Sequence, residues 1–202
     1  FVDDPPTAAD DSFTVGEDAP YASLNVKAND SDPHGDAITI RHLLNHTSGV
    51  LDYEELMPKP YAGQVLDAGV LVLLEAQDRL YFPPGSTYRY SNSAYALLSL
   101  VVERASGMPY ADFLRARIFA PLGMDATLAH VHGGPAVAHR AFGYSRKDGR
   151  WQRTDQSTTS AVLGDGGIYS SIDDLAKWDA ALYDDRLLDD DSRALAFTAH
   201  AK

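Results

Sequence analysis

A phenol, a hydroxyl and a carboxamide stand side by side at Tyr90, Ser91 and Asn92. A phenol can donate or accept a proton, and an amide can both donate and accept hydrogen bonds. The triplet follows the turn-forming residues 83–85 (Pro-Pro-Gly) and precedes a run with helical spacing, so Ser91 or Asn92 can cap a helix. The triplet is therefore a candidate for acid–base chemistry, and the simpler alternative is a polar capping turn.

The helix predicted behind the triplet is the element that must position it. Apolar residues recur there at helical spacing, and they are Ala94, Leu97, Leu98, Val101, Val102 and Ala105. Gly107 follows this run, at a place where a left-handed residue would end the helix. We therefore expect a long helix from the triplet to Gly107, with this apolar stripe buried.

Further helices are predicted on both sides of this one, each from a cap or a turn signal. They cover residues 40–45 after the cap Thr39, a stretch within 64–80, residues 110–119, a helix opened by Ser171 and Asp174, and residues 190–199. The segments 141–144 and 151–154 flank Lys147-Asp148-Gly149 and are typical of a hairpin. The expected fold is mainly α with minor β, preceded by short N-terminal strands.

Composition and charge exclude several classes of function. The chain is 45% hydrophobic without a long apolar run, which is typical of a globular protein with a real core. It has no cysteine, so disulfides and thiol catalysis are excluded. A net charge of −12 opposes binding to nucleic acid and to anionic membrane, because both are held through Lys and Arg contacts to phosphate. We expect no nucleic-acid partner and no membrane insertion.

The first 36 residues differ in composition from the rest, with nine acidic residues against Lys27 alone. This break indicates two segments of different origin, residues 1–37 and 38–202. Residues 1–37 contain two short strand-like runs, and the segment resembles part of an immunoglobulin-like or cadherin-like repeat of bacterial surface proteins. A non-catalytic secreted adhesion or calcium-binding module is therefore an alternative function.

Two groups of residues raise the question of a metal. The acidic loop Asp30–Asp36 has the spacing of a calcium loop in part, but His34 and Arg41 stand where an EF-hand needs oxygen ligands, so an acidic turn or a weak calcium site both remain open. His130, His132 and His139 lack accompanying carboxylates, and a polar loop explains them as well as a metal cluster does. We expect no metal and no cofactor.

Three segments carry a family resemblance. They are ITIRHLLNHTSGV at residues 38–50, the stretch from Tyr90 to Met124, and GDGGIYSSIDDLAKW at residues 164–178. In this order they resemble the serine β-lactamase and penicillin-binding-protein-like hydrolases, a group that includes class C β-lactamases, D-alanyl-D-alanine peptidases and esterases. The resemblance implies the helical region of that α/β fold and acyl transfer on β-lactam, peptide or ester substrates. It also implies a peptidoglycan-like acyl partner and a periplasmic or extracellular location in bacteria.

The resemblance also implies roles for particular residues. In the family, a Ser-x-x-Lys helix supplies the nucleophile, and a Tyr-x-Asn triplet supplies a general acid or base and an orienting amide. That triplet carries over to Tyr90 and Asn92. No Ser-x-x-Lys occurs in the sequence, and the family's third element, a Lys-Thr-Gly or His-x-Gly strand, does not follow residue 178. We therefore expect an incomplete, catalytically silent hydrolase domain.

Overall fold

The structure is a computed structural model that describes residues 37–199. The predicted N-terminal strands and the Asp30–Asp36 loop lie outside this range. Within it, helices dominate, and the only strands are two short antiparallel pairs. The expectation of a mainly α fold with minor β is confirmed for these residues. None of the described helices is long and apolar enough to cross a membrane.

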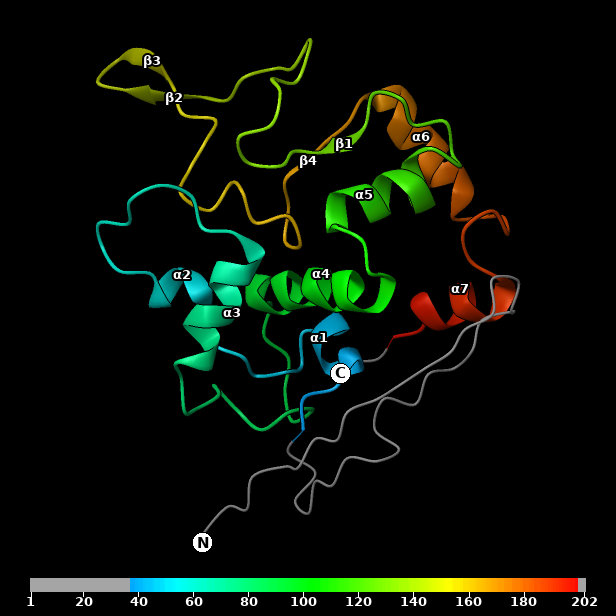
Figure 1. Ribbon diagram of the computed structural model, residues 1–202, viewed down its shortest axis with the longest axis horizontal. Coiled ribbons are helices and arrows are strands. Elements are labelled where there is room, and N and C mark those ends of the chain that lie inside the picture. Colours follow the sequence, from blue (N-terminus) through cyan, green and yellow to red (C-terminus); the bar gives the residue numbers. More distant parts are fainter. Residues whose placement is uncertain (1–36, 200–202) are drawn as a thin grey trace, which may run out of the picture.

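Helix α4 (Asn92–Ser106) lies at the centre of the fold, and the other helices are arranged around it (Figure 1). These are α1 (Ile40–Leu44), α2 (Tyr53–Leu56), α3 (Asp67–Glu75), α5 (Tyr110–Leu114) with the π-helical turn η1 (Arg115–Phe119), α6 (Ile172–Ala181) and α7 (Asp190–Ala196). In Figure 1, α1, α2 and α3 lie below and to the left of α4, while α5 and α6 lie above it. Helix α4 is therefore the element around which the other helices are described.

Both ends of α4 are formed as the sequence predicts. Ser91 is the cap, and its hydroxyl oxygen accepts the amide of Ala94 at 3.0 Å. At the other end Gly107 is left-handed, with a φ of 68°, and its amide donates to the carbonyl of Glu103 at 2.9 Å. A residue without a Cβ adopts this conformation without steric cost, so the helix stops there.

The buried face of α4 differs from the predicted apolar stripe. Its most buried residues are small, namely Ser93, Ala94, Ala96 and Ser99, whereas Val101 is 36% exposed. At Ala96 the reason is a close backbone contact, because a Cβ at Gly164 would lie 2.2 Å from the carbonyl oxygen of Tyr95 and 2.8 Å from the Cα of Ala96. Only small side chains allow the loop around Gly164 to approach α4 so closely. Leu97 and Leu98 remain partly buried, against Leu43 and Val50.

Three apolar clusters hold these helices together. One joins α2, α3 and α4 through Tyr53, Val70 and Ala96. A second joins α5, η1, β1 and α6. The third packs α1 against α4 through Leu43 and Ala94. Two of the three clusters therefore include α4. They hold it against α1, α2 and α3, which precede it in the chain, and against Val162, which follows it.

Several predicted boundaries need correction. The helix expected within 64–80 is only α3, Asp67–Glu75, and the last helix ends at Ala196 rather than near 199. The helix expected over 110–119 exists, but its second half is the wider turn η1, with the amide of Ala120 bonded to the carbonyl of Arg115 at 2.9 Å. These ends depend on tertiary contacts that local signals do not contain.

The strands are short. β1 (Leu128–Ala129) pairs with β4 (Ile168–Tyr169), and β2 (Tyr144–Lys147) pairs with β3 (Arg150–Arg153). The predicted hairpin is thus present, but its turn is only Asp148-Gly149, where both residues are left-handed with φ values of 50° and 77°. That conformation gives a two-residue turn, so both strands extend closer to the turn than the sequence predicts. The hairpin is exposed throughout and lies away from the helices in Figure 1.

Candidate functional site

The side chains of Tyr90, Ser91 and Asn92 point in two directions. Ser91 has an extended backbone, with φ −143° and ψ 111°, so the side chains on either side of it point away from its own. Ser91 is buried at 7% exposure and serves as the helix cap, whereas Tyr90 is 63% exposed. The hydroxyl of Tyr90 and the amide of Asn92 make no side-chain hydrogen bond to any residue within 37–199. Both polar groups are therefore available to a ligand, and the Ser91 hydroxyl is not.

Residues 46–49 hold the approach to this triplet. The amides of Tyr81, Gly85 and Arg89 donate to the carbonyls of Gly49, Thr47 and His46 at 2.7, 2.8 and 2.9 Å, respectively. Gly49 is left-handed, and a Cβ there would lie 2.1 Å from the carbonyl oxygen of Phe82. The end of the family-like segment 38–50 therefore supports the loop that leads to Tyr90.

The third family-like segment reaches α4 through Asp67. One carboxylate oxygen of Asp67 accepts the Ser99 hydroxyl and the Gly164 amide, both at 2.8 Å, and the other accepts the Leu163 amide at 2.9 Å. This carboxylate joins α3, α4 and the loop before β4. All three sequence segments therefore converge on α4, although the ranges 38–50 and 164–178 are far apart along the chain.

A second buried polar group lies next to this loop. The hydroxyl of Tyr53 donates to Asp165 at 2.8 Å, and the amide of Tyr53 donates to the Ser93 hydroxyl at 2.9 Å. Burial raises the pKa of Asp165 to about 6, and burial together with this carboxylate raises the pKa of Tyr53 above its usual range. The carboxyl of Asp165 is therefore harder to ionise than a free aspartate, and it lies against the buried phenol of Tyr53.

Sequence reasoning missed these supporting residues. Asp67 opens α3 and Asp165 lies within the GDGG run, so each reads locally as a cap or turn residue. Asp67 bonds to Leu163 and Gly164, and Asp165 bonds to Tyr53. In both cases the partners are about a hundred positions apart, and no local periodicity reveals such pairs. His46 was also missed, although its place directly after the helix predicted over residues 40–45 was a usable signal.

Other predicted candidates do not assemble into a site. Among residues 37–199, no group of three or more metal-ligating side chains is found, and His130 instead packs edge-on against Tyr169 with ring centroids 5.5 Å apart. Lys177 donates to Asp174 at 2.8 Å and to the carbonyl of Gly123. Asp174 also accepts the amide of Ala126 and the hydroxyl of Thr127, both at 2.8 Å. Lys177 therefore ties α6 to the loop before β1.

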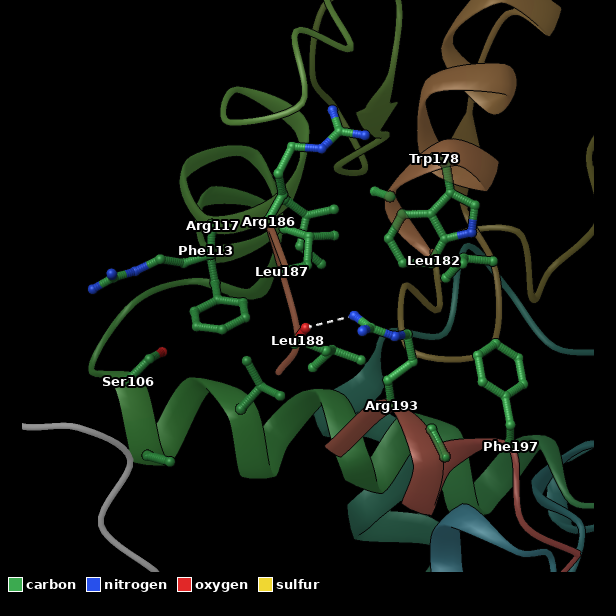
Figure 2. Close-up of a pocket in the computed structure, with 15 residues that line it drawn as sticks. Ser106, Phe113, Arg117, Trp178, Leu182, Arg186, Leu187, Leu188, Arg193 and Phe197 are labelled. Atoms are coloured by element: carbon green, nitrogen blue, oxygen red, sulfur yellow. Dashed lines mark hydrogen bonds between the residues drawn. The ribbon is translucent and has the colours of Figure 1, made fainter. Parts of the chain in front are cut away.

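A separate hollow of about 750 Å³ lies at the opposite end of α4 (Figure 2). Its walls are mainly apolar and come from α4, α5, η1, α6 and α7, with Phe113, Trp178 and Phe197 among the larger side chains. Figure 2 shows Arg193 reaching toward the carbonyl of Leu188, to which it donates at 3.0 Å. Arg193 is also paired with Asp185 at 3.0 Å and with Asp190. This arginine holds the segment before α7 in place.

Comparison with known proteins identifies the class to which this fold and site belong. The Beta-lactamase family model matches residues 18–201, which is most of the chain. The chain therefore belongs to the beta-lactamase family. The match begins inside the acidic segment, and the comparisons give no support to an immunoglobulin-like repeat there or to an adhesion or calcium-binding module.

Particular relatives narrow this class. The chain is 33% identical over 175 residues to penicillin-binding protein 4* of Bacillus subtilis, covering 80% of this chain and 39% of that protein. It is 32% identical over 158 residues to the D-aminopeptidase of Brucella anthropi, covering 76% and 29%, respectively. The chain thus spans well under half the length of these curated relatives.

Solved structures agree with the sequence relatives. A penicillin binding protein from Bacillus halodurans superposes with a TM-score of 0.71 at 31% identity, over 82% of this chain and 52% of that one. A D-amino acid amidase from Ochrobactrum anthropi SV3 superposes with a TM-score of 0.63 at 32% identity, over 76% and 46%. The arrangement around α4 is therefore that of penicillin-binding-protein-like hydrolases.

Proposed function

We propose that this chain carries the acid–base and substrate-orienting part of a serine hydrolase site that acts by acyl transfer on peptide, amide or β-lactam substrates. The supporting observation is the triplet at the start of α4. Tyr90 and Asn92 point away from the buried cap Ser91, and their polar groups make no hydrogen bond to the described residues. Membership of the beta-lactamase family gives this geometry its chemical meaning.

Each side chain has a distinct proposed role. The hydroxyl of Tyr90 exchanges a proton with the attacking or leaving group, and the amide of Asn92 hydrogen-bonds to the acyl group and fixes its orientation. Asn92 is the first residue of the capped helix α4, and Tyr90 lies directly before the cap. The backbone amides on either side of Tyr90 bond to His46, so the separation of the two side chains is set before a substrate binds. This preorganisation is the contribution of α1, α4 and the segment 46–49.

The covalent step needs a nucleophile that the triplet does not supply. No Ser-x-x-Lys occurs among the 202 residues, and the Ser91 hydroxyl is used as the helix cap. We therefore expect these residues alone to bind an acyl substrate weakly and to form no acyl-enzyme. Two relatives, named as a D-aminopeptidase and a D-amino acid amidase, suggest amides of D-amino acids as the substrate class to test first.

Binding and acylation can be measured separately on the chain. D-Phenylalanine amide is titrated while amide and side-chain resonances are followed by NMR, and we expect shifts at Tyr90 and Asn92. Asn92→Ala should abolish these shifts, whereas Asn45→Ala, at the end of α1, should preserve them. Absence of any shift near α4 at millimolar ligand contradicts the proposed function.

Acylation is followed by incubating the chain with a fluorescent penicillin and measuring its intact mass. We expect no added mass. A stable adduct would show that one of the chain's own serines is the nucleophile, and it would overturn the expectation of silence while leaving the proposed reaction class standing.

A further inference from the structure

His46 occupies a backbone position that usually belongs to glycine. It directly follows the last turn of α1, where the amide of His46 donates to the carbonyl of Leu43 at 3.2 Å and the amide of Thr47 donates to the carbonyl of His42 at 2.8 Å. These two bonds form a Schellman stop with His46 as its left-handed residue, at φ 56°. A non-glycine residue in this conformation is strained by about 1 kcal/mol or more, and such strain persists only where the surrounding structure holds the residue in place.

The side chain of His46 lies against the candidate site. Its ring stacks on Tyr95 with centroids 4.9 Å apart and an interplanar angle of 28°. Its other contacts are with Tyr90, at 4.6 Å and 36°, and with the edge of Tyr88, at 6.0 Å. Tyr95 is itself fixed, because its hydroxyl donates to the carbonyl of Leu44 at 3.1 Å. The imidazole thus connects an anchored ring on α4 to the exposed ring of Tyr90.

His46 also holds the backbone on both sides of Tyr90. Its carbonyl accepts the amide of Arg89 at 2.9 Å, and its Nδ1 accepts the amide of Ser91 at 3.2 Å. An Nδ1 that accepts a hydrogen bond carries no proton, so the neutral ring has its proton on Nε2. Protonation of Nδ1 would place two donors against each other and break the bond to Ser91.

We propose that His46 is the positioning residue of Tyr90, and that its neutral imidazole fixes the ring of Tyr90 through the stack with Tyr95 and through the amide of Ser91. The chemical role of Tyr90 rests on the proposed function, but its placement by His46 does not. Protonation of His46 releases this placement, so the order of the site depends on pH.

The surroundings of His46 give the direction of this dependence. The titratable groups in contact with its ring are the phenols of Tyr88 and Tyr90 from the approach to α4 and of Tyr95 from α4 itself. On α1, the charged or titratable side chains are Arg41 and His42. Arg89, on the approach, lies over the Tyr81 ring and is paired with Glu55 at 3.4 Å. No ion pair of the described residues includes His46.

Burial lowers the pKa of His46 below 6.5. A lowered pKa in the folded state means that the folded chain favours the neutral ring. The contribution of His46 to stability is therefore complete above pH 6.5 and is lost as the pH falls through the folded-state pKa. The neutral ring of His46 therefore holds the ring of Tyr90 in position at pH 7, and this hold is lost when His46 is protonated in acid.

This placement can be tested without any substrate by labelling the chain with 3-fluorotyrosine and recording fluorine NMR spectra. Tyr90→Phe identifies the Tyr90 resonance. We expect that resonance to shift in a single step as the pH falls below 6.5, with the same midpoint as the amide resonance of Ser91. His46→Gly should abolish the step at Tyr90 while the chain stays folded, because glycine suits the left-handed position.

Two further variants separate positioning from folding. His46→Asn tolerates the left-handed backbone and keeps a side-chain acceptor but has no ring, so it should retain the Ser91 amide environment and lose the step at Tyr90. If His46→Gly does not fold, His46→Asn decides the question. His132→Asn, at an exposed histidine, should leave the step unchanged.

A Tyr90 resonance that is insensitive both to pH and to loss of the His46 ring would overturn the proposal. These readouts are independent of substrate. A chain that fails to bind D-phenylalanine amide can still show the step, and a chain that binds it can lack the step. The two proposals can therefore fail separately.

Discussion

The two ends of α4 are held in different ways. Toward its N-terminal end, a helix cap, the partly buried carboxylate of Asp67 and a close backbone contact at Gly164 fix the helix to its neighbours. Toward its C-terminal end, Val102 and Ala105 face a hollow of about 750 Å³ with mainly apolar walls. Hydrogen bonds and backbone contacts depend steeply on position, whereas apolar contacts tolerate small shifts. We therefore expect the N-terminal end to be rigid and intolerant of substitution, and the C-terminal end to be permissive.

The largest effect is expected from Gly164→Ala, because the new Cβ would lie 2.2 Å from the Tyr95 carbonyl oxygen and 2.8 Å from the Ala96 Cα. Both atoms belong to the helix backbone and cannot move aside. The free energy of unfolding should fall by about 3 kcal/mol. Denaturant unfolding followed by circular dichroism measures this loss.

Gly166→Ala is the matched control, since a Cβ there meets no atom within 4 Å and the loop is the same. Equal losses in the two variants would show that the loop responds to any substitution. That outcome would contradict the close contact between Gly164 and α4.

A medium effect is expected from Asp165→Asn, which keeps an acceptor for the Tyr53 hydroxyl but removes the charge. Because burial raises the pKa of Asp165 from 3.8 to about 6, the folded chain favours the protonated carboxyl. Its contribution to stability is present below pH 3.8 and is lost as the pH rises through about 6. The variant should therefore be more stable than the parent at pH 7.5 by about 1 kcal/mol, after allowance for solvent screening, and equal to it near pH 4.

Thermal unfolding at several pH values checks this sign. Asp148→Asn, in the exposed hairpin turn, is the isosteric control for the substitution itself. A gain that is the same at pH 4 and pH 7.5 would exclude ionisation of Asp165 as its cause.

A smaller effect is expected at the C-terminal end from Ala105→Leu, which adds apolar volume to the wall of the hollow. The unfolding free energy should rise by about 0.5 kcal/mol. Ala180→Leu, at an exposed position on α6 outside the hollow, should leave it unchanged. A loss at position 105 as large as that at Gly164 would contradict the contrast between the two ends.

The smallest effect on stability is expected from Tyr90→Phe, because the hydroxyl of Tyr90 makes no hydrogen bond to the described residues. Tyr95→Phe removes the bond to the carbonyl of Leu44 and should cost about 0.5–1 kcal/mol. Comparing the two variants by denaturant unfolding separates a phenol free for a ligand from one that anchors the helix. A larger cost at Tyr90 would show that its hydroxyl has an intramolecular partner.

The sequence predicted what local chemistry determines. Thr39, Ser91 and Ser171 cap helices as expected, and Gly107 ends α4. It could not predict which face of α4 is buried, because the close approach of Gly164 comes from a segment some seventy positions away. The triplet was found from its residue types, and His46 could have been found from its place directly after the first predicted helix. Asp67 and Asp165 act through distant partners and carry no local signal. Whether Tyr90 and Asn92 perform catalysis remains a proposal.

The π-helical turn η1 marks a place where a residue can be inserted into or deleted from the sequence. Its bond from the Ala120 amide to the Arg115 carbonyl spans one residue more than an α-helical bond, so the helix holds an extra residue without losing its axis. The following bonds, from Gly123 to Ala120 at 3.0 Å and from Met124 to Phe119 at 2.8 Å, then end the helix in a regular way. Deleting one residue between 115 and 119 would return the turn to α-helical form. Related chains that differ here by a single residue would therefore keep the same neighbours on both sides, and an alignment gap at this point would not mark a change of fold.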